Sequence, residues 1–330
     1  MGDRNQRPIL DPVKPLIDQR IRDGLFAALV AVVTALALRF WLTNPQDYLH
    51  YSVLEELTGI DFGTWPDVFY SGGGGDGEVF AVLAADPLGS GPSQLIPEVL
   101  YRFIRIGFAW LAWAFSLGRE QLVLPALFAV GLLAVSGVGF ISGFLRERLG
   151  PKSWALLINP ALYIGFIGDT AEPLGILLLV LSLTVSGFWA AVALGITRPT
   201  YAAALVGKWK LLSEVVAAAI VIRLLAFGLF GGSMFATINR AFSLPFVAYF
   251  DNPSVVGFLV LAGAVFTIGI GIIRRDLAWV VAGIFVVVLG VGVTAHPLNA
   301  VRAAGMVPVL WAFGPKWKGG YGSYGNKEPS

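Results

Sequence analysis

The chain lacks cysteine altogether and contains only two histidines. Disulfide bonds, iron–sulfur clusters and thiolate metal sites are therefore excluded, as is a histidine-rich metal site. Charge is also scarce: 13% of the residues are charged, about half of the ~25% found in soluble domains. So little charge excludes a soluble globular enzyme and a disordered protein. The net charge of +2 and the absence of a basic face argue against a nucleic-acid partner.

Apolar residues make up 56% of the chain, and they come in long runs rather than being spread evenly. A helix that crosses a membrane needs about 20 such residues. The sequence therefore predicts an all-α fold, a polytopic bundle of about nine transmembrane helices. The expected spans cover residues 24–43, 121–145, 153–168, 172–186, 188–197, 211–231, 254–273, 277–294 and 300–313. The spans within 172–197 are short, and we expect them to be tilted, broken or re-entrant.

The run at 101–117 is apolar but short, and it carries Arg102 and Arg105. We expect it to form an interfacial helix attached to the first external loop, because aromatic and amphipathic helices favour that position. The distribution of basic residues supports this. If 101–117 does not cross, the basic clusters all fall on one side, which the positive-inside rule assigns to the cytoplasm. These clusters lie in 4–22, 146–152, 274–275 and 316–318.

The predicted organisation follows from these spans. Residues 1–23 form a cytoplasmic N-terminal segment, and its polar stretch is too long for a cleavable signal peptide. Residues 24–313 form a single transmembrane domain of an integral protein of the cell membrane, and 314–330 form a polar cytoplasmic tail. The tail's lysines are placed to touch anionic lipid headgroups.

The only large extramembrane segment is the external loop 44–100, which holds nine acidic residues and no Lys or Arg. Selection for translocation explains the missing bases. It does not explain the sequence SGGGGDGEVF, where four glycines lead into Asp76 and Glu78. A glycine hinge beside a carboxylate is typical of a loop that closes over a substrate. The plainer interpretation is a surface turn, and a P-loop is excluded because no GxxxxGK follows.

A second acidic site ends the third predicted span, where Asp169, Thr170 and Glu172 lie between two apolar runs. Asp169 or Thr170 could simply cap the helix that Pro173 begins. Carboxylates at a membrane edge are nevertheless costly to keep, which makes them functional candidates. By the predicted topology they face the same side as Asp76.

Four arginines are exceptions on faces that otherwise lack positive charge. Arg198, in GITRPTY, and Arg302, in AHPLNAVRAAGMVP, lie near the outer face, and Arg223 lies deeper within the sixth long apolar segment. Arginine forks suit phosphate, and a lipid-linked phosphate is the natural anion at this depth. We expect Arg39, at the end of the first span, to snorkel to the interface. His296, in the same outer turn as Arg302, is given little weight because a lone histidine is usually structural.

The order of these parts resembles the glycosyltransferase C superfamily, above all its small bacterial and GPI-mannosyltransferase-like branches. The resemblance spans roughly residues 20–313 in layout. It rests on the order of the motifs and their shared side of the membrane. The residues that carry it are Asp76-Gly77, then Asn159-Pro160 with Asp169, Thr170 and Glu172, then Thr197-Arg198-Pro199-Thr200, and finally Arg302 and Pro308. Two departures are the shortness of the chain and the lack of aromatic residues after Asp76-Gly77.

The resemblance implies an inverting transfer of a mannose-like sugar from a polyprenyl-phosphate donor to a glycan, lipid or protein acceptor on the extracytoplasmic face. It implies that Asp76 is the general base and that Glu78, Asp169 and Glu172 shape the acceptor or metal site. Mg²⁺ or Mn²⁺ would suit Asp76, Asp169 and Glu172, although nothing in the sequence requires a metal. Arg198, Arg302 and Arg223 would hold the lipid phosphate, with His296 and Thr170 as lesser candidates.

Two other functions stay open. A transporter or flippase for a lipid-linked anion would also use buried arginines and broken helices, but it predicts inverted repeats, and the acidic loop occurs only once. A non-catalytic subunit of a glycosylation complex agrees with the short chain. The glycine-hinged carboxylate favours the enzyme.

Overall fold

The computed structural model is all-α, and the residues it describes contain no β-strand. The described residues are 13–42, 47–70, 76–89, 91–95, 102–185, 187–231, 246–251, 253–289 and 297–313. The predicted cytoplasmic tail therefore lies outside them, as do the glycines 72–75 and His296. Helices pack on helices throughout, as the sequence predicts.

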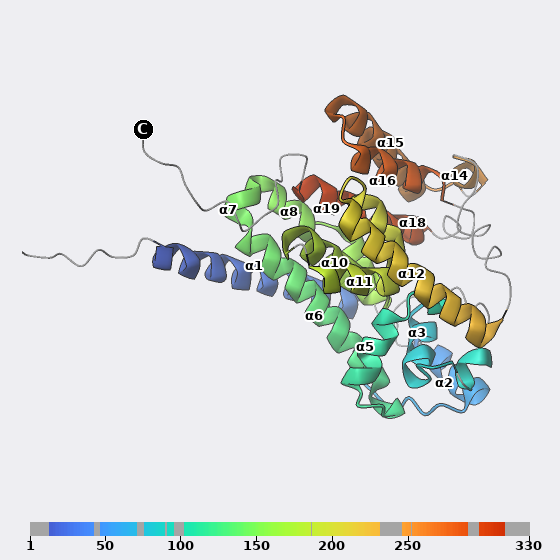
Figure 1. The fold of residues 1–330 in the computed structure, drawn as a ribbon. Coiled ribbons are helices and arrows are strands. Elements are labelled where there is room, and N and C mark those ends of the chain that lie inside the picture. Colours follow the sequence, from blue (N-terminus) through green and yellow to red (C-terminus); the bar gives the residue numbers. More distant parts are fainter. Residues whose placement is uncertain are drawn as a thin grey trace, which may run out of the picture.

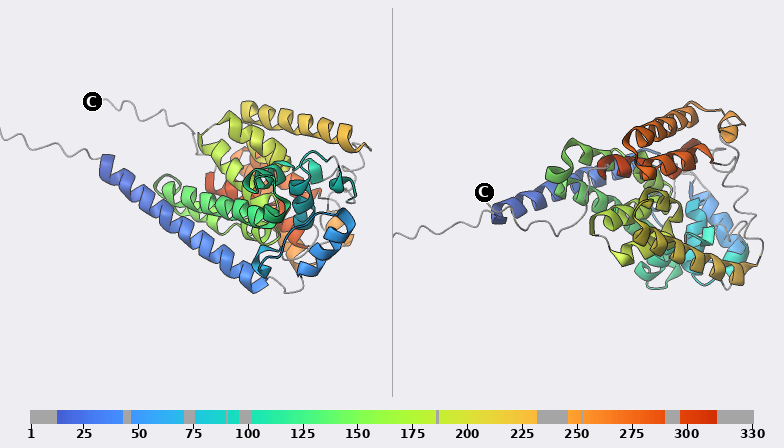
Figure 2. Two further views of the ribbon diagram at one scale, coloured as in Figure 1. Left: turned by 90° about the horizontal axis from the view of Figure 1, so that it is seen from below. Right: turned by 45° about the horizontal axis from the view of Figure 1, so that its top comes forward.

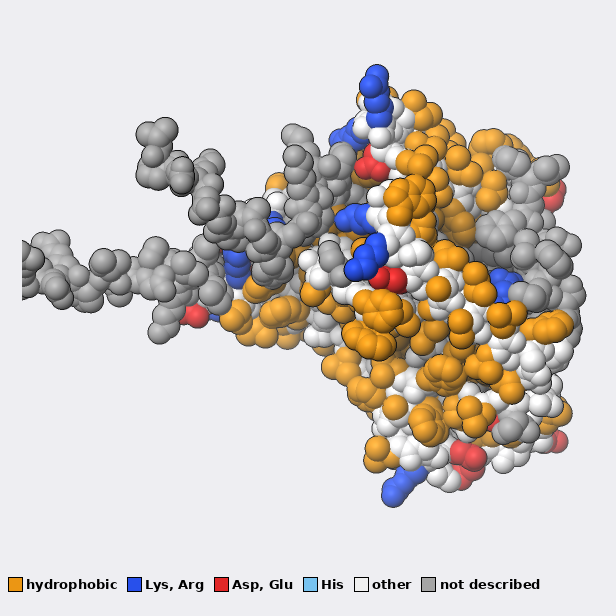
Figure 3. Space-filling view, in the orientation of Figure 1, with side chains coloured by type: hydrophobic (Ala, Val, Ile, Leu, Met, Phe, Trp, Pro, Cys, Tyr) orange, Lys and Arg blue, Asp and Glu red, His pale blue; other side chains and the backbone are white. Residues whose placement is uncertain are grey.

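Four helices are long and apolar enough to cross a membrane. They are α1 (Val13–Leu42), α6 (Val123–Phe144), α12 (Trp209–Phe230) and α15 (Val255–Arg274). The shortest has 20 residues, which gives about 30 Å, the thickness of a hydrocarbon core. Their exposed surfaces are apolar, and hydrophobic side chains cover most of the described surface in Figure 3. These features indicate a membrane protein.

Helices α1 and α6 lie side by side in Figures 1 and 2. Small residues allow the close approach: a Cβ on Gly139 would lie 2.9 Å from the carbonyl oxygen of Ala27, and one on Gly143 would clash with the backbone of Asp23. Such spacing of small residues is a common means of packing membrane helices. At one end, Arg20 binds Glu147 at 2.7 Å, so the start of α1 meets the end of α6 and the two helices are antiparallel.

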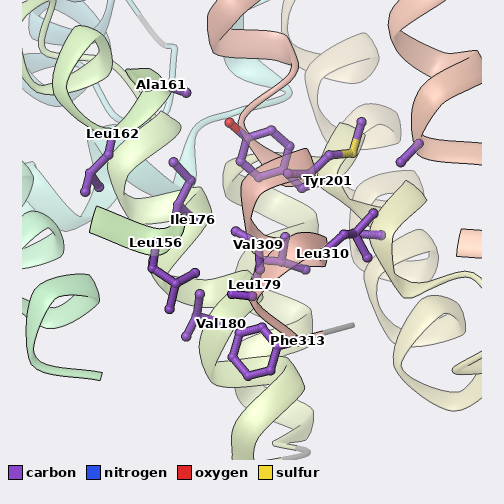
Figure 4. Packing of buried hydrophobic residues seen from close by; sticks show 14 of the residues in the cluster. Leu156, Ala161, Leu162, Ile176, Leu179, Val180, Tyr201, Val309, Leu310 and Phe313 are labelled. Atoms are coloured by element: carbon purple, nitrogen blue, oxygen red, sulfur yellow. The ribbon is translucent and has the colours of Figure 1, made fainter. Parts of the chain in front are cut away.

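Shorter helices fill the space beside the long ones. They are α8 (Trp154–Leu157), α9 (Pro160–Ile167), α10 (Glu172–Val185), α11 (Phe188–Thr197), η5 (Pro199–Leu205), α16 (Leu277–Val287), α18 (Pro297–Ala303) and α19 (Met306–Phe313). Their buried apolar side chains, such as Ile176, Leu179 and Val309, interlock in the core (Figure 4). Two predicted spans are broken: 153–168 at Asn159, which caps α9, and 300–313 between α18 and α19.

The end of the bundle where α6 and α15 finish and α12 begins carries the basic residues Arg20, Arg146, Lys152, Lys208 and Arg274, and is called the basic end below. The last turn of α10, the start of α12, the start of α16 and Phe313 line one pocket there. Helix α19 contacts α8 and the 3₁₀ helix η4 (Gly150–Ser153), which joins this pocket to the end of α6. The short helix α7 (Arg146–Leu149) also lies at the basic end.

The first loop folds over the opposite end. It contains α2 (Asp47–Thr58), η1 (Asp67–Phe69), α3 (Asp76–Ala85) and η2 (Pro92–Leu95), and the segment that follows it contains α5 (Gly107–Phe115) and η3 (Glu120–Leu122). A second apolar cluster, including Tyr51, Phe80 and Phe108, holds these elements on the first half of α6. Helix α5 has nine residues, about 14 Å of helix, which is too short to cross a membrane. Helix α14 (Val247–Asp251) leads into α15.

Candidate functional site

Two carboxylates and four arginines meet at the end of the bundle opposite the basic end. The Arg302 guanidinium joins the two acids: its Nη2 lies 2.7 Å from Asp76 Oδ2 and 3.2 Å from Glu172 Oε1. Glu172 Oε1 also binds Arg198 Nη2 at 2.9 Å. On the other side of Asp76, Arg102 Nε lies 3.1 Å from Oδ1 and Arg105 Nη1 lies 3.6 Å from Oδ2. These six residues are called the arginine cluster below.

Segments far apart in the sequence supply the cluster. Asp76 begins α3 and Glu172 begins α10. Both carboxylates therefore stand at helix N-termini, where the positive end of the helix dipole stabilises a negative charge. Arg198 directly follows α11, where Pro199 begins a new 3₁₀ helix. Arg302 lies in the last turn of α18.

Glycines let these segments approach one another. A Cβ on Gly175 would lie 2.7 Å from the Cβ of Arg198, and one on Gly165 would lie 2.8 Å from the Cβ of Glu172. Both distances are too short for two carbon atoms without movement of the backbone. The apolar helices around the cluster thus contain glycine where larger side chains would separate Arg198 from Glu172.

Two polar side chains bind the backbone at the break between α18 and α19, next to Arg302. The hydroxyl of Tyr201 donates to the carbonyl oxygen of Arg302 at 2.9 Å, and Asn159 Nδ2 donates to the carbonyl oxygen of Gly305 at 2.8 Å. Tyr201 and Asn159 are fully buried. Carbonyl groups at a helix end need partners outside the helix, and these two side chains bind carbonyls on either side of the break between α18 and α19. The two bonds therefore fix the chain that carries the Arg302 guanidinium.

The cluster carries an excess of positive charge. Four guanidiniums face two carboxylates, which leaves two net positive charges among the six residues. Glu172 is fully buried and the Asp76 side chain is 17% exposed. Arg302 Nε is also buried and has no hydrogen-bond partner among the described residues. The arrangement is suited to an additional anion with several acceptor oxygens.

Asp76 stays charged in this setting. Burial alone would raise the pKa of its carboxyl group, but the positive charges of Arg105, Arg302 and Arg102 outweigh it and hold the pKa well below the ordinary value of 3.8. An aspartate with so low a pKa is a weak proton acceptor while the arginines surround it.

The cluster is recessed into the bundle. The Glu172 side chain is fully buried, and the side chains of Arg105, Arg198 and Arg302 are only 5%, 10% and 11% exposed.

Asp169 belongs to a separate site. It forms a two-pronged ion pair with Arg39, with Nη1–Oδ1 at 2.6 Å and Nη2–Oδ2 at 2.7 Å. Arg39 also donates to the carbonyl oxygens of Val68 and Tyr70 and lies between the rings of Phe128 and Phe166. The Arg39 side chain is completely buried. Our expectation that Arg39 snorkels to the interface is therefore wrong, because buried acceptors satisfy it in place of water.

The other predicted site residues are spread around the cluster. Glu78 lies on α3 with Asp76, and its carboxylate is 3.9 Å from His50 Nδ1. The Thr170 hydroxyl donates to the carbonyl oxygen of Gly165 and closes the turn before α10. Arg223 lies partly exposed in α12, and the ion pairs described for the cluster do not include it.

The described geometry favours an anion over a metal ion. Among the described residues, no group of three or more histidine, aspartate or glutamate side chains could hold a metal. Asp76 and Glu172 face guanidiniums, and Asp169 is occupied by Arg39. These carboxylates, as arranged, do not fit Mg²⁺ or Mn²⁺.

Arg102 and Arg105 are the cluster members that sequence reasoning did not identify as site residues. We treated them as interfacial because they begin an aromatic helix. A signal was present: they are the first basic residues after a loop with nine acids and no Lys or Arg. Opposite charges brought together in a membrane-facing domain are expected to pair.

Comparison with known proteins adds no relative. No protein-family model matches the chain, and neither a curated protein nor a solved structure is significantly similar to it.

Proposed function

We propose that the protein is an integral membrane glycosyltransferase of the cell membrane. It moves a mannose-like sugar from a polyprenyl-phosphate donor to a glycan, lipid or protein acceptor on the extracytoplasmic face, with inversion. The observation that carries the proposal is the recessed arginine cluster with its two excess positive charges. The four long helices, with the shorter helices packed beside them, form the membrane domain, with the N-terminus and the basic end in the cytoplasm.

The cluster provides a binding site for the donor's phosphate. Guanidinium groups match the oxygens of a phosphate in pairs, and Arg302 has a buried Nε that lacks a partner among the described residues. The depth of the cluster suits a phosphate whose prenyl chain lies in the membrane. A soluble nucleotide sugar would not require a site recessed among apolar helices.

The reaction follows from these positions. Asp76 takes the proton of the acceptor hydroxyl, and the oxygen forms a bond to the anomeric carbon of the sugar. The bond from that carbon to the phosphate oxygen breaks, and the lipid phosphate leaves with the electron pair. Arg302 and Arg198 stabilise the charge that grows on the leaving phosphate. When a phosphate draws guanidiniums away from Asp76, the pKa of its carboxyl group rises and it becomes a better base.

One observation favours a second function, that of a non-catalytic subunit that binds a lipid phosphate. Both oxygens of Asp76 are engaged by arginines, as expected of a carboxylate that holds structure in place. Such a subunit would bind the phosphate through the same cluster without transferring the sugar.

The test is sugar transfer in membrane vesicles supplied with labelled polyprenyl-phosphate mannose. We expect transfer by the wild type and its collapse in Asp76→Asn and Arg302→Gln. The matched control is Glu56→Gln, an exposed acid on α2 in the same loop, which should transfer normally. Binding of a short-chain prenyl phosphate is measured in parallel, and Arg302→Gln should weaken it.

The outcomes separate the two functions. Binding without transfer by the wild type, across several lipid-linked sugars, would overturn the transferase in favour of the non-catalytic subunit. Equal transfer by wild type and Asp76→Asn would remove Asp76 as the base.

A further inference from the structure

The basic end contains a pocket that the proposed function does not use. It has a volume of about 220 Å³ and is lined by residues of η5, α10, α16 and α19, together with the start of α12. Two charged side chains of opposite sign line it, Lys208 and Asp276. It is smaller than the ~300–1,000 Å³ typical of drug-sized sites, and it suits a small polar group.

Each charged residue stands at the start of a helix, and the two helix ends differ. Lys208 is the N-cap of α12, and its side chain makes no capping hydrogen bond. A helix N-terminus beside a lysine favours a phosphate, through backbone N–H groups and positive charge. Asp276 caps α16 by accepting from the Ala278 N–H at 3.0 Å. One wall of the pocket thus favours an anion and another favours a cation.

Lys208 is half-buried and lines the pocket together with Asp276. Burial lowers the pKa of its amine, and the negative charge of Asp276 opposes that change. A phosphate beside Lys208 would add a second, closer negative charge. A bound group with a phosphate at Lys208 and an ammonium at Asp276 would match both side chains.

We propose that this pocket binds the headgroup of a zwitterionic phospholipid, phosphatidylethanolamine in particular. The phosphate lies at Lys208 and the N-terminus of α12, and the primary ammonium donates to Asp276. The site is separate from the arginine cluster and does not depend on the sugar-transfer activity.

Apolar side chains beside the pocket favour a lipid over a free phosphate. Trp209 follows Lys208 and is 64% exposed, and Leu277 follows Asp276 and is 53% exposed. These residues begin α12 and α16, whose outward faces are apolar. Tryptophan is favoured at the membrane–water boundary. Acyl chains attached to a headgroup in the pocket would run along these apolar surfaces.

The experiment is native mass spectrometry of the full chain after exchange into mixed vesicles. The vesicles contain equal amounts of phosphatidylethanolamine, phosphatidylcholine and phosphatidylglycerol. We expect preferential retention of phosphatidylethanolamine, by about tenfold, because only its headgroup combines a phosphate with an ammonium that donates hydrogen bonds. Lys208→Gln and Asp276→Asn should each abolish the preference. Asparagine also caps helices, so Asp276→Asn retains the start of α16.

The matched control is Lys210→Gln. It removes an exposed lysine that lies two residues after Lys208 and does not line the pocket. It should retain the wild-type preference. Equal retention of the three lipids by the wild type, or an unchanged preference in both pocket variants, would overturn the proposal. Preference for phosphatidylglycerol would also overturn it, because Asp276 would then have no role. Displacement of the lipid by free phosphoethanolamine at equal concentration would show a soluble ligand instead.

Discussion

Asp169 and Glu172 are three residues apart and both are buried, yet they belong to two different kinds of charged site. Asp169 has one arginine, Arg39, and each of its oxygens binds one guanidinium nitrogen. Glu172 binds two arginines, Arg198 and Arg302, and shares Arg302 with Asp76, in a cluster with more cations than anions. The first site is balanced within itself and the second is not. An excess of buried charge is costly unless something offsets it, and the proposed lipid phosphate would do so at the second site.

The two sites also differ in what they hold together. Two of the carbonyl groups that Arg39 binds come from η1 and the residue after it, directly before the segment that leads to Asp76, and another, that of Phe166, comes from α9. The Arg39–Asp169 pair therefore joins α1, the first loop and the α9–α10 turn. We interpret this pair as structural support for the cluster, and the predictions below test that division.

Breaking the Arg39–Asp169 pair should have the largest effect on folding. Arg39→Met or Asp169→Asn leaves an unpaired buried group, which costs about 3–5 kcal/mol in comparable cases. We expect a large loss of thermal stability in detergent. The double variant Arg39→Met with Asp169→Asn removes both charges, and asparagine tolerates the left-handed backbone of residue 169, so it should lose less stability than the two single variants added together. If the double variant lost as much stability as the two single variants added together, the ion pair would not be the main contribution of these residues to stability.

Glu172→Gln should raise the affinity for a prenyl phosphate, whereas Arg302→Gln should lower it. It raises the excess of positive charge in the cluster, so we expect a short-chain prenyl phosphate to bind about tenfold more tightly. Titration of the folded protein measures this. Asp169→Asn, compared over its folded fraction, should leave the affinity unchanged. If Asp169→Asn altered affinity as much as Glu172→Gln, the two sites would be one.

Acid should weaken the cluster by a smaller amount. The pKa of Asp76 is lower in the folded protein than the ordinary 3.8, so the stability it contributes is present above that value. That stability is lost as the pH falls below 3.8 through the folded-state pKa. Between about pH 5 and about pH 3, the unfolding temperature of the wild type should therefore fall more steeply than that of Asp76→Asn. Parallel profiles would mean that Asp76 is not held by the arginines.

The apolar pattern predicts the long helices well, because length and composition are enough to identify them. The run at 188–197 coincides with α11, and the spans beginning near residues 24, 121, 211 and 254 overlap the four long helices, although α1 begins eleven residues before its predicted span. Breaks at Asn159 and Gly305 are harder to predict. They depend on partners far away in the sequence, since Asn159 itself supplies the bond to the Gly305 carbonyl.

The site was partly predictable from the order of the motifs. Asp76, Glu172, Arg198 and Arg302 meet in one cluster, but Asp169 does not join them. The backbone explains this: Asp169 has φ of +46°, a left-handed turn that directs its carboxylate to Arg39 while Glu172 begins the next helix. Aspartate tolerates this conformation better than most residues, but sequence spacing alone does not reveal the turn.

The Arg39–Asp169 pair also imposes an order on synthesis. The partners are 130 residues apart, and α1 enters the membrane first. At about 5–20 residues per second, Asp169 is made about 7–26 s after Arg39. During that interval the first helix carries a charge that the bilayer disfavours. Until the α9–α10 turn is inserted, the nascent chain must keep Arg39 in contact with water, lipid phosphates or the insertion machinery. Delayed pairing of Arg39, which can follow the packing of α1 on α6, is therefore built into the biogenesis of this protein.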